Sequence, residues 1–184
     1  KNNFRISVLL LTLCLVTSAY ANDGGTAAAP ARFSGWEGVG PGGGDIRAIA
    51  IDPKDKNRLF VTTLDGQVYT SSDAGKTWKF LVLFNRPQIT LDDIIVDRED
   101  SRNIFVSGHR HLQPGGFMYS NDGGTTWNES KDLKNEPIHG LAQSHSNPNL
   151  LIAGGDGRVF LSFNKGVDWK RITDDSVAFR KVIV

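Results

Sequence analysis

Tryptophans recur along the chain at a nearly fixed spacing. They stand at positions 36, 78, 127 and 169, which gives intervals of 42, 49 and 42 residues. The last three close related runs, SSDAGKTW, SNDGGTTW and SFNKGVDW. A period of roughly 40–50 residues is typical of β-propellers and other repeat architectures, in which each repeat is one structural unit. The expected unit of this fold is therefore a repeat of that length.

Each repeat contains short segments with the composition of β-strands. The first segment reads IRAIAID, LDDIIVD and IHGLAQ in successive copies, the second RLFV, NIFV and NLLI, and the third GQVY, GFMY and GRVF. Pairs that favour turns, such as Asp-Pro, Asn-Pro and Asp-Gly, separate them, and no window has a sustained helical period. With a fourth strand after each tryptophan, such a repeat of about 40 residues is one blade of a β-propeller.

We therefore expect an all-β chain, a β-propeller built from four-stranded antiparallel blades. Complete blades are expected near residues 45–83, 90–133 and 137–174, and the first strand of a further blade at 178–184. Trp36 to Val39 should be the fourth strand of another blade. On this count, residues 36–184 are a fragment of a propeller of roughly six to eight blades.

The repeated run resembles a motif of known propellers. S-x-D-x-G-x-T-W is similar to the Asp-box, also called the bacterial neuraminidase repeat. The wider pattern, in which W and GPGGG lead into AIDP and SSDAGKTW, resembles propellers of the sortilin, photosystem II assembly-factor and xyloglucanase types over residues 36–184. One propeller architecture serves many functions, so the resemblance implies the fold more strongly than any activity.

The repeated run also has the residues of a turn that bonds to itself. The residues expected to build it are Ser71, Asp73, Gly75, Trp78, Ser120, Asp122, Gly124, Trp127, Ser162, Asn164, Gly166 and Trp169. An Asp side chain accepts hydrogen bonds from backbone N–H groups of a tight loop, Gly takes positive φ, and Trp buries a large surface. Asn164 replaces the acid in the third copy, and Asn cannot act as a general acid or nucleophile. We therefore expect a structural role for the turn.

The N-terminal segment has the pattern of an export signal. Two basic residues, the apolar run ISVLLLTLCLV and the sequence AYA match a secretory signal over residues 1–21, with cleavage after Ala21. Residues 22–35, rich in Gly and Ala, would form a flexible lead-in. We expect a secreted or periplasmic protein with no membrane span after cleavage and, once Cys14 is removed, no disulfide. Its formal charge would fall from +1 to −1, so no basic field favours nucleic acid.

The second repeat is longer than the others because it contains two insertions. Three extra residues follow Trp78, and four lie between the second and third strands. We expect both as loops on the face opposite the repeated turns, and loops on a rigid scaffold often carry binding residues. The candidate binding residues there are Phe84, Arg86, Gln88, His109, Arg110, His111 and Gln113. Arg47 and Arg180 occupy equivalent inner-strand positions and could line a central channel.

The histidines His109 and His111 raise the question of a metal site. Alternate residues of a strand point to the same side, so both imidazoles could face one ion. A zinc site, however, needs three or four ligands, and the sequence shows no evident acidic partner for this pair. We expect no metal and no other cofactor, and ligand contact and simple solvent exposure are the alternatives for these histidines.

Two classes of function are compatible with the sequence. The preferred hypothesis is an exported, non-catalytic propeller that binds a protein or glycan. The alternative is a glycoside hydrolase, xyloglucanase-like or sialidase-like, which generally needs two carboxyl groups across the glycosidic bond. The resemblance to xyloglucanases implies an acid in a T-D-[IV]-G-G stretch, but the chain reads TLDGQ, with Asp65 one place later. Asp65 is therefore only a weak catalytic candidate, and the arginines of a sialidase site are represented by Arg47 and Arg180 alone.

Overall fold

The computed structural model describes residues 38–42, 45–110 and 113–173, and in these residues every regular element is a β-strand. Outside the described residues lie the predicted signal (1–21), lead-in (22–35) and next-blade strand (178–184), together with His111 and Arg180. In the described part, no helix has the length and apolar character needed to cross a membrane.

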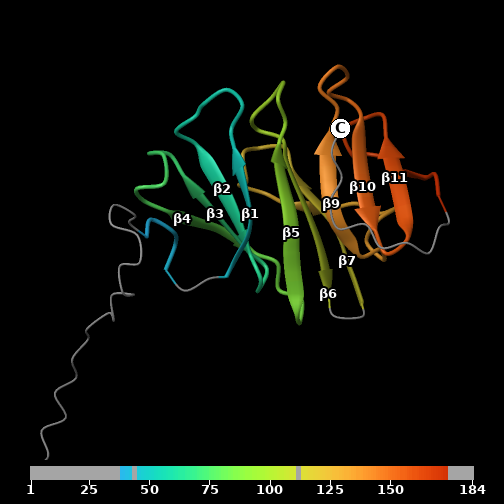
Figure 1. Cartoon of the computed structure of the whole chain (residues 1–184), viewed down its shortest axis with the longest axis horizontal. Helices are drawn as coiled ribbons and strands as arrows, with labels where there is room; N and C mark the ends of the chain where they lie inside the picture. Colours follow the sequence, from blue (N-terminus) through green and yellow to red (C-terminus); the bar gives the residue numbers. More distant parts are fainter. Residues whose placement is uncertain (1–37, 43–44, 111–112, 174–184) are drawn as a thin grey trace, which may run out of the picture. The chain divides into compact units, whose positions relative to one another are not determined.

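The strands form three antiparallel sheets, each a meander of four strands (Figure 1). The first consists of β1 (Ile46–Ile51), β2 (Leu59–Thr63), β3 (Gln67–Ser71) and β4 (Lys79–Leu83). The second consists of β5 (Ile89–Val96), β6 (Ile104–Arg110), β7 (Gln113–Ser120) and β8 (Asn128–Glu129). The third consists of β9 (Ile138–Gln143), β10 (Leu151–Gly155), β11 (Arg158–Ser162) and β12 (Lys170–Arg171). Each sheet has the strand order of a propeller blade, and we call them the first, second and third blades.

The connections divide between the two ends of the blades. In Figure 1 the turn from β5 to β6 lies at the upper end of its blade, whereas β6 and β7 meet at the lower end. The repeated turn between the third and fourth strands bonds to the turn between the first and second: Ala74 N donates to Asn57 O at 2.9 Å and Lys165 N to Asn149 O at 3.0 Å. These two kinds of turn therefore share one end, which we call the turn end.

Apolar layers hold neighbouring blades together. The layer between the first and second blades includes Phe60, Val68, Ile94 and Met118, and the layer between the second and third includes Phe105, Phe117, Leu151 and Phe160. Trp127 packs edge-to-face against Phe84, with ring centroids 5.3 Å apart, and Trp169 against Phe117 at 5.0 Å. Each of these tryptophans therefore seals its blade against the preceding one. Full burial of one such apolar side chain is worth about 1.5–3 kcal/mol.

Trp78 has a different environment from the other two tryptophans. Its indole N–H donates to the carbonyl of Val39, whereas the indoles of Trp127 and Trp169 each donate to a glycine carbonyl of their own turn at 3.0 Å. Gly38 and Val39 lie outside any strand. The prediction of a strand over Trp36 to Val39 is therefore wrong for the two residues of it that are described, since the Val39 carbonyl bonds to a side chain and not to a strand ladder.

The repeated turn is held by its own side chains. In the first copy Ser71 Oγ accepts from Gly75 N at 2.9 Å and donates to Asp73 Oδ1 at 2.7 Å, and Asp73 Oδ1 accepts from Thr77 N at 2.8 Å. The second copy, Ser120 to Trp127, repeats these bonds within 0.1 Å. Gly75 has φ of 89°, a left-handed conformation that favours glycine. The acid of this motif is thus an acceptor for backbone N–H groups.

The third copy keeps the turn although its polar pair is reversed. In the second copy Thr126 Oγ1 donates to Asp122 Oδ2 at 2.6 Å. In the third copy Asn164 Nδ2 donates to Asp168 Oδ2 at 2.8 Å, and Asn164 Oδ1 still accepts from Asp168 N at 3.0 Å. The carboxylate has moved from the third position of the motif to the seventh, and the donor has moved the other way. The replacement of Asp by Asn is therefore compensated within the same turn.

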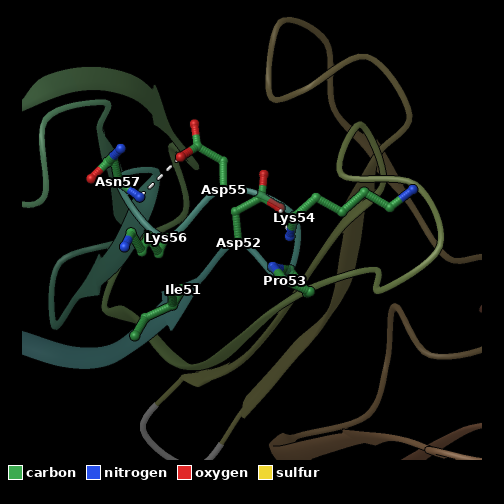
Figure 2. A pocket seen from close by; sticks show the side chains of 7 residues that line it. All are labelled: Ile51, Asp52, Pro53, Lys54, Asp55, Lys56 and Asn57. Carbon is green, nitrogen blue, oxygen red and sulfur yellow. Dashed lines mark hydrogen bonds between the residues drawn. The ribbon is translucent and has the colours of Figure 1, made fainter.

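Polar side chains at the turn end also tie the blades to one another. Asp97 is fully buried, and its Oδ2 accepts from Lys165 Nζ of the third blade at 2.8 Å. Between the first and second blades, Asp52 Oδ1 accepts from Ser101 Oγ at 2.5 Å. Figure 2 shows the pocket at this β1–β2 turn, from which Lys54 extends to donate to the carbonyl of Glu99. Of the charged groups of this pocket, Asp52 and Lys54 thus join the two blades, whereas Asp55 accepts from Asn57 N of its own turn.

The reversed pair predicts that the second turn can be converted into the third. Asp122→Asn alone should lower the melting temperature by a few degrees, because the amide is a poorer acceptor for Thr126. Adding Thr126→Asp should restore most of the loss, since it recreates the Asn164–Asp168 pair. Thermal unfolding followed by circular dichroism measures both, with Asp122→Asn combined with Thr125→Asp as the matched control. A double variant no more stable than Asp122→Asn would contradict this explanation.

The buried, hydrogen-bonded carboxylate of Asp97 leads us to expect that the fold loses stability in acid. Burial alone would raise its pKa, but hydrogen bonds from Lys165, Asn103, Glu99 N and Gln143 outweigh burial and hold the pKa below its usual value. Because the folded pKa lies below the unfolded one, ionised Asp97 stabilises the fold above about pH 4, and this contribution is lost as pH falls through the folded pKa. Asp97→Asn should cost about 1.5–3 kcal/mol at pH 7 and flatten the loss below pH 4 in urea unfolding. Asp45→Asn, at an exposed position, is the control and should change neither the stability at pH 7 nor its loss below pH 4. If Asp97→Asn lost as much stability below pH 4 as the parent chain does, Asp97 would not be the group responsible.

Candidate functional site

The end of the blades opposite the turn end carries a cluster of polar side chains. It is built where the first strands of neighbouring blades, β1, β5 and β9, lie side by side (Figure 1). The lower end of the β6–β7 hairpin adds a further side chain, that of His109. Residues from all three blades therefore reach one site.

A β-bulge near the start of each first strand supplies one residue to this site. In β5 the ladder passes from Leu91 to Asp93 opposite consecutive residues of β6, which leaves Asp92 as the extra residue. The same irregularity makes Arg47 the extra residue of β1 and His139 that of β9. A bulge leaves its extra residue unpaired in the ladder and changes the direction of its side chain. The bulged positions are equivalent in the repeat but hold three different residue types.

The three bulged residues and His109 are in contact, and we call them the bulge cluster. The carboxylate of Asp92 lies at its centre: Oδ2 contacts Nδ1 of His109 and lies 3.2 Å from Nδ1 of His139, and Oδ1 lies 3.5 Å from Nη2 of Arg47. Only 8% of the Asp92 side chain is exposed, against 46% for Arg47. The cluster thus has a buried anionic centre with a cation reaching solvent.

The imidazole of His139 is held from both sides. Its Nε2 lies 3.1 Å from Oδ1 of Asp156, in the turn between β10 and β11, while Nδ1 faces Asp92. The rings of His109 and His139 lie with centroids 4.5 Å apart. The hydrogen bond with Asp92, helped by Asp156, raises the pKa of His139 above its usual value, although burial opposes this. The site therefore favours positive charge beside Asp92.

His109 reaches the cluster because the insertion of the second blade lengthens its strands. The register shifts between Gly108 and His109, and Arg110 pairs with Gln113 at the end of the hairpin. The backbones pack closely here, since a Cβ on Gly108 would lie 2.5 Å from the carbonyl oxygen of Thr90. The expectation of a projecting loop is wrong for the described residues of this insertion, because His109 and Arg110 of β6 pair with Pro114 and Gln113 of β7.

Other predicted binding residues have structural partners. Arg86 donates through Nη1 to the Gly115 carbonyl at 2.8 Å and pairs through Nη2 with Glu129 Oε2 at 2.7 Å, so it braces β7 and β8. Gln88 is an exposed turn residue with φ of 59°. Phe84 packs on Trp127, as described above. Of the predicted binding set, Arg47 and His109 are in the bulge cluster, and His111 and Arg180 lie outside the described residues.

The sequence prediction for the histidines also differs from the structure. His109 was expected to have His111 as its neighbour and no acidic partner, but it contacts Asp92 of the adjacent strand and His139 of the next blade. The residues missed were Asp92, His139 and Asp156. The first two share the repeat position of Arg47, the second letter of IRAIAID, LDDIIVD and IHGLAQ. Reading that column across the repeats could have found them.

Comparisons with known proteins support the fold. No protein-family model matches the chain, and no curated protein sequence matches it. Solved structures do: an ancestral GH74 enzyme (25% identity, TM-score 0.63, 78% of this chain and 20% of that one) and the GH74 xyloglucanase of Xanthomonas campestris (15%, 0.57, 70% and 21%). YCF48 bound to D1 peptide also matches (12%, 0.54, 70% and 40%).

The chain thus spans about a fifth of the length of the GH74 enzymes that it matches. These neighbours share a propeller architecture with the three meandering blades of this chain. The prediction of an all-β chain with four-stranded propeller blades is confirmed.

Proposed function

We propose that the chain is an exported, non-catalytic β-propeller that binds a protein or glycan ligand at the bulge cluster. The observation that carries this proposal is the repeated bulge, by which each of three blades contributes one polar side chain to one site. Side chains held by a rigid scaffold present a fixed pattern of charge, which favours recognition of a complementary partner. Export rests on the N-terminal sequence pattern described above.

The exposed members of the site have the chemistry of ligand contacts. The Arg47 guanidinium is about half exposed, and 65% of the Asp156 side chain is exposed. The guanidinium offers N–H donors to carboxylate or hydroxyl groups of a ligand, and the carboxylate of Asp156 can accept from its N–H or O–H groups. Support for a protein ligand comes from a neighbour of the same fold, YCF48, which is bound to a peptide.

Asp92 of the bulge cluster and the catalytic candidate Asp65 both have partners that do not favour hydrolysis. A glycoside hydrolase generally needs one carboxyl group as acid and another as base or nucleophile. Asp92 is shared between Arg47 and two imidazoles. Asp65 accepts from Thr63 Oγ1 at 2.6 Å and from Gln67 Nε2 at 3.2 Å, so both of its oxygens serve the β2–β3 turn. This is why the binding function is preferred.

Substitution of Arg47 tests the binding site. The full chain would be screened on peptide and glycan arrays, and the best ligand titrated by calorimetry. Arg47→Ala should weaken its binding by about tenfold or more, the effect of losing roughly 1.4 kcal/mol of interaction. Arg102→Ala, an exposed arginine at the turn end, is the matched control and should bind as the parent does. Unchanged binding by Arg47→Ala, or an equal loss in Arg102→Ala, would mean that the ligand binds elsewhere.

Glycoside hydrolysis is the second candidate, favoured by the similarity to GH74 enzymes. If the alternative is correct, the chain releases reducing sugar from a panel of β-glucans, and Asp65→Asn abolishes the release. We expect no release by the parent chain, because Asp65 is occupied within its turn. Asp55→Asn, in the turn between β1 and β2, is the control for general effects of removing a carboxylate. Release that depends on Asp65 would replace the binding proposal with the enzymatic one.

A further inference from the structure

We propose that Asp92, His109 and His139 bind a divalent transition metal ion, with Zn²⁺ as the ion that fits best. The ligand atoms are one carboxylate oxygen of Asp92 and one ring nitrogen of each histidine, and they all lie within 4.8 Å of one another. Among residues 38–42, 45–110 and 113–173, these three side chains form the one group of His, Cys, Asp or Glu residues whose ligand atoms lie close enough together to hold a metal ion. The inference is independent of the proposed ligand-binding function, since it concerns the site before any ligand arrives.

The donor set selects the class of ion. Two imidazole nitrogens and one carboxylate oxygen suit Zn²⁺ and neighbouring first-row ions, whereas Ca²⁺ and Mg²⁺ prefer ligand sets made of oxygen. Three protein ligands also leave the fourth position of a tetrahedral ion open for water or for a group of a bound partner. The site therefore resembles an open zinc site more than a closed structural one.

The spacing of the ligand atoms is close to what a bound ion requires. Zinc ligands lie about 2.0–2.1 Å from the ion, so two ligand atoms of a tetrahedral site are separated by about 3.3 Å. Nδ1 of His139 already lies 3.2 Å from Oδ2 of Asp92. Nδ1 of His109 contacts the same oxygen directly, so the His109 ring must move away from Asp92 when an ion binds. The ion would thus replace direct contacts between the three side chains.

Groups around the ligands orient them toward one point. When Nε2 of His139 carries the proton and donates to Asp156, its Nδ1 lone pair faces Asp92, as in a carboxylate–histidine–zinc arrangement. Arg47 lies near Oδ1 of Asp92 and leaves Oδ2 for the ion. An ion would take the place of the proton that the histidines share with Asp92, and it would meet the carboxylates of Asp92 and Asp156 beside the single guanidinium of Arg47. The local charge therefore favours a cation.

The ligands also sit on rigid and separate elements. Asp92 and His109 belong to β5 and β6 of the second blade, and His139 to β9 of the third. A bound ion would join the two blades at the end opposite the tie between Asp97 and Lys165. Because it would bind the folded chain preferentially, it should raise the melting temperature.

Calorimetric titration of the metal-depleted full chain with Zn²⁺ tests the proposal. We expect saturation at one ion per chain and a higher melting temperature with Zn²⁺ than with Mg²⁺. His109→Ala and His139→Ala should each weaken binding by more than about 100-fold, and Asp156→Ala by about 10–100-fold, the range found for groups that orient a ligand. His145→Ala is the matched control, because His145 is an exposed histidine at the turn end and should leave binding unchanged.

A spectroscopic measurement keeps the test valid if a variant does not fold. Co²⁺ added to the parent chain should give the intense visible absorption of a four-coordinate site, and Zn²⁺ should displace it. Absence of saturable Zn²⁺ uptake, or equal losses in His145→Ala and His109→Ala, would overturn the metal site. Metal uptake that persists in Arg47→Ala while ligand binding is lost would separate this inference from the proposed function.

Discussion

A blade of four short strands cannot bury its apolar residues alone, and this constraint organises the whole molecule. Each blade needs a neighbour against its face, and the buried layers lie between blades. Where a blade face has no described sheet packed on it, apolar side chains are exposed, as for Ile49 and Ile51 of β1 at 62% and 61%. Trp127 and Trp169 stand at the points where the turn of one blade meets the preceding blade.

The polar side chains at the two ends of the blades make different kinds of contact. At the turn end, side chains bond to their own backbone or tie one blade to the next, as Ser120 and Lys165 do. At the other end, the bulges bring side chains together that take no part in the strand ladder. Charged groups of similar type thus stabilise the fold at one end and form the candidate site at the other.

The fold could be predicted from the sequence because the repeat records it three times. Tryptophan spacing, strand segments and turn residues all indicate the same blade. The candidate site was anticipated only in part: the sequence singled out Arg47 and His109, but not Asp92 and His139. Their meeting depends on where the ladder slips by one residue and on how blades pack, and neither is visible in a single segment. Arg86 was predicted to bind a ligand, and the structure gives its guanidinium two partners, Gly115 of β7 and Glu129 of β8, that the sequence did not indicate.

The repeated bulge has a consequence for how such a protein can change. The extra residue of a bulge is unpaired in the strand ladder. The pairing of the strand therefore does not require a particular side chain at that position. Arginine, aspartate and histidine already occupy the three copies. Substitution of one bulged residue can therefore alter the chemistry of the candidate site one blade at a time, while the strand pairing of the blades stays the same.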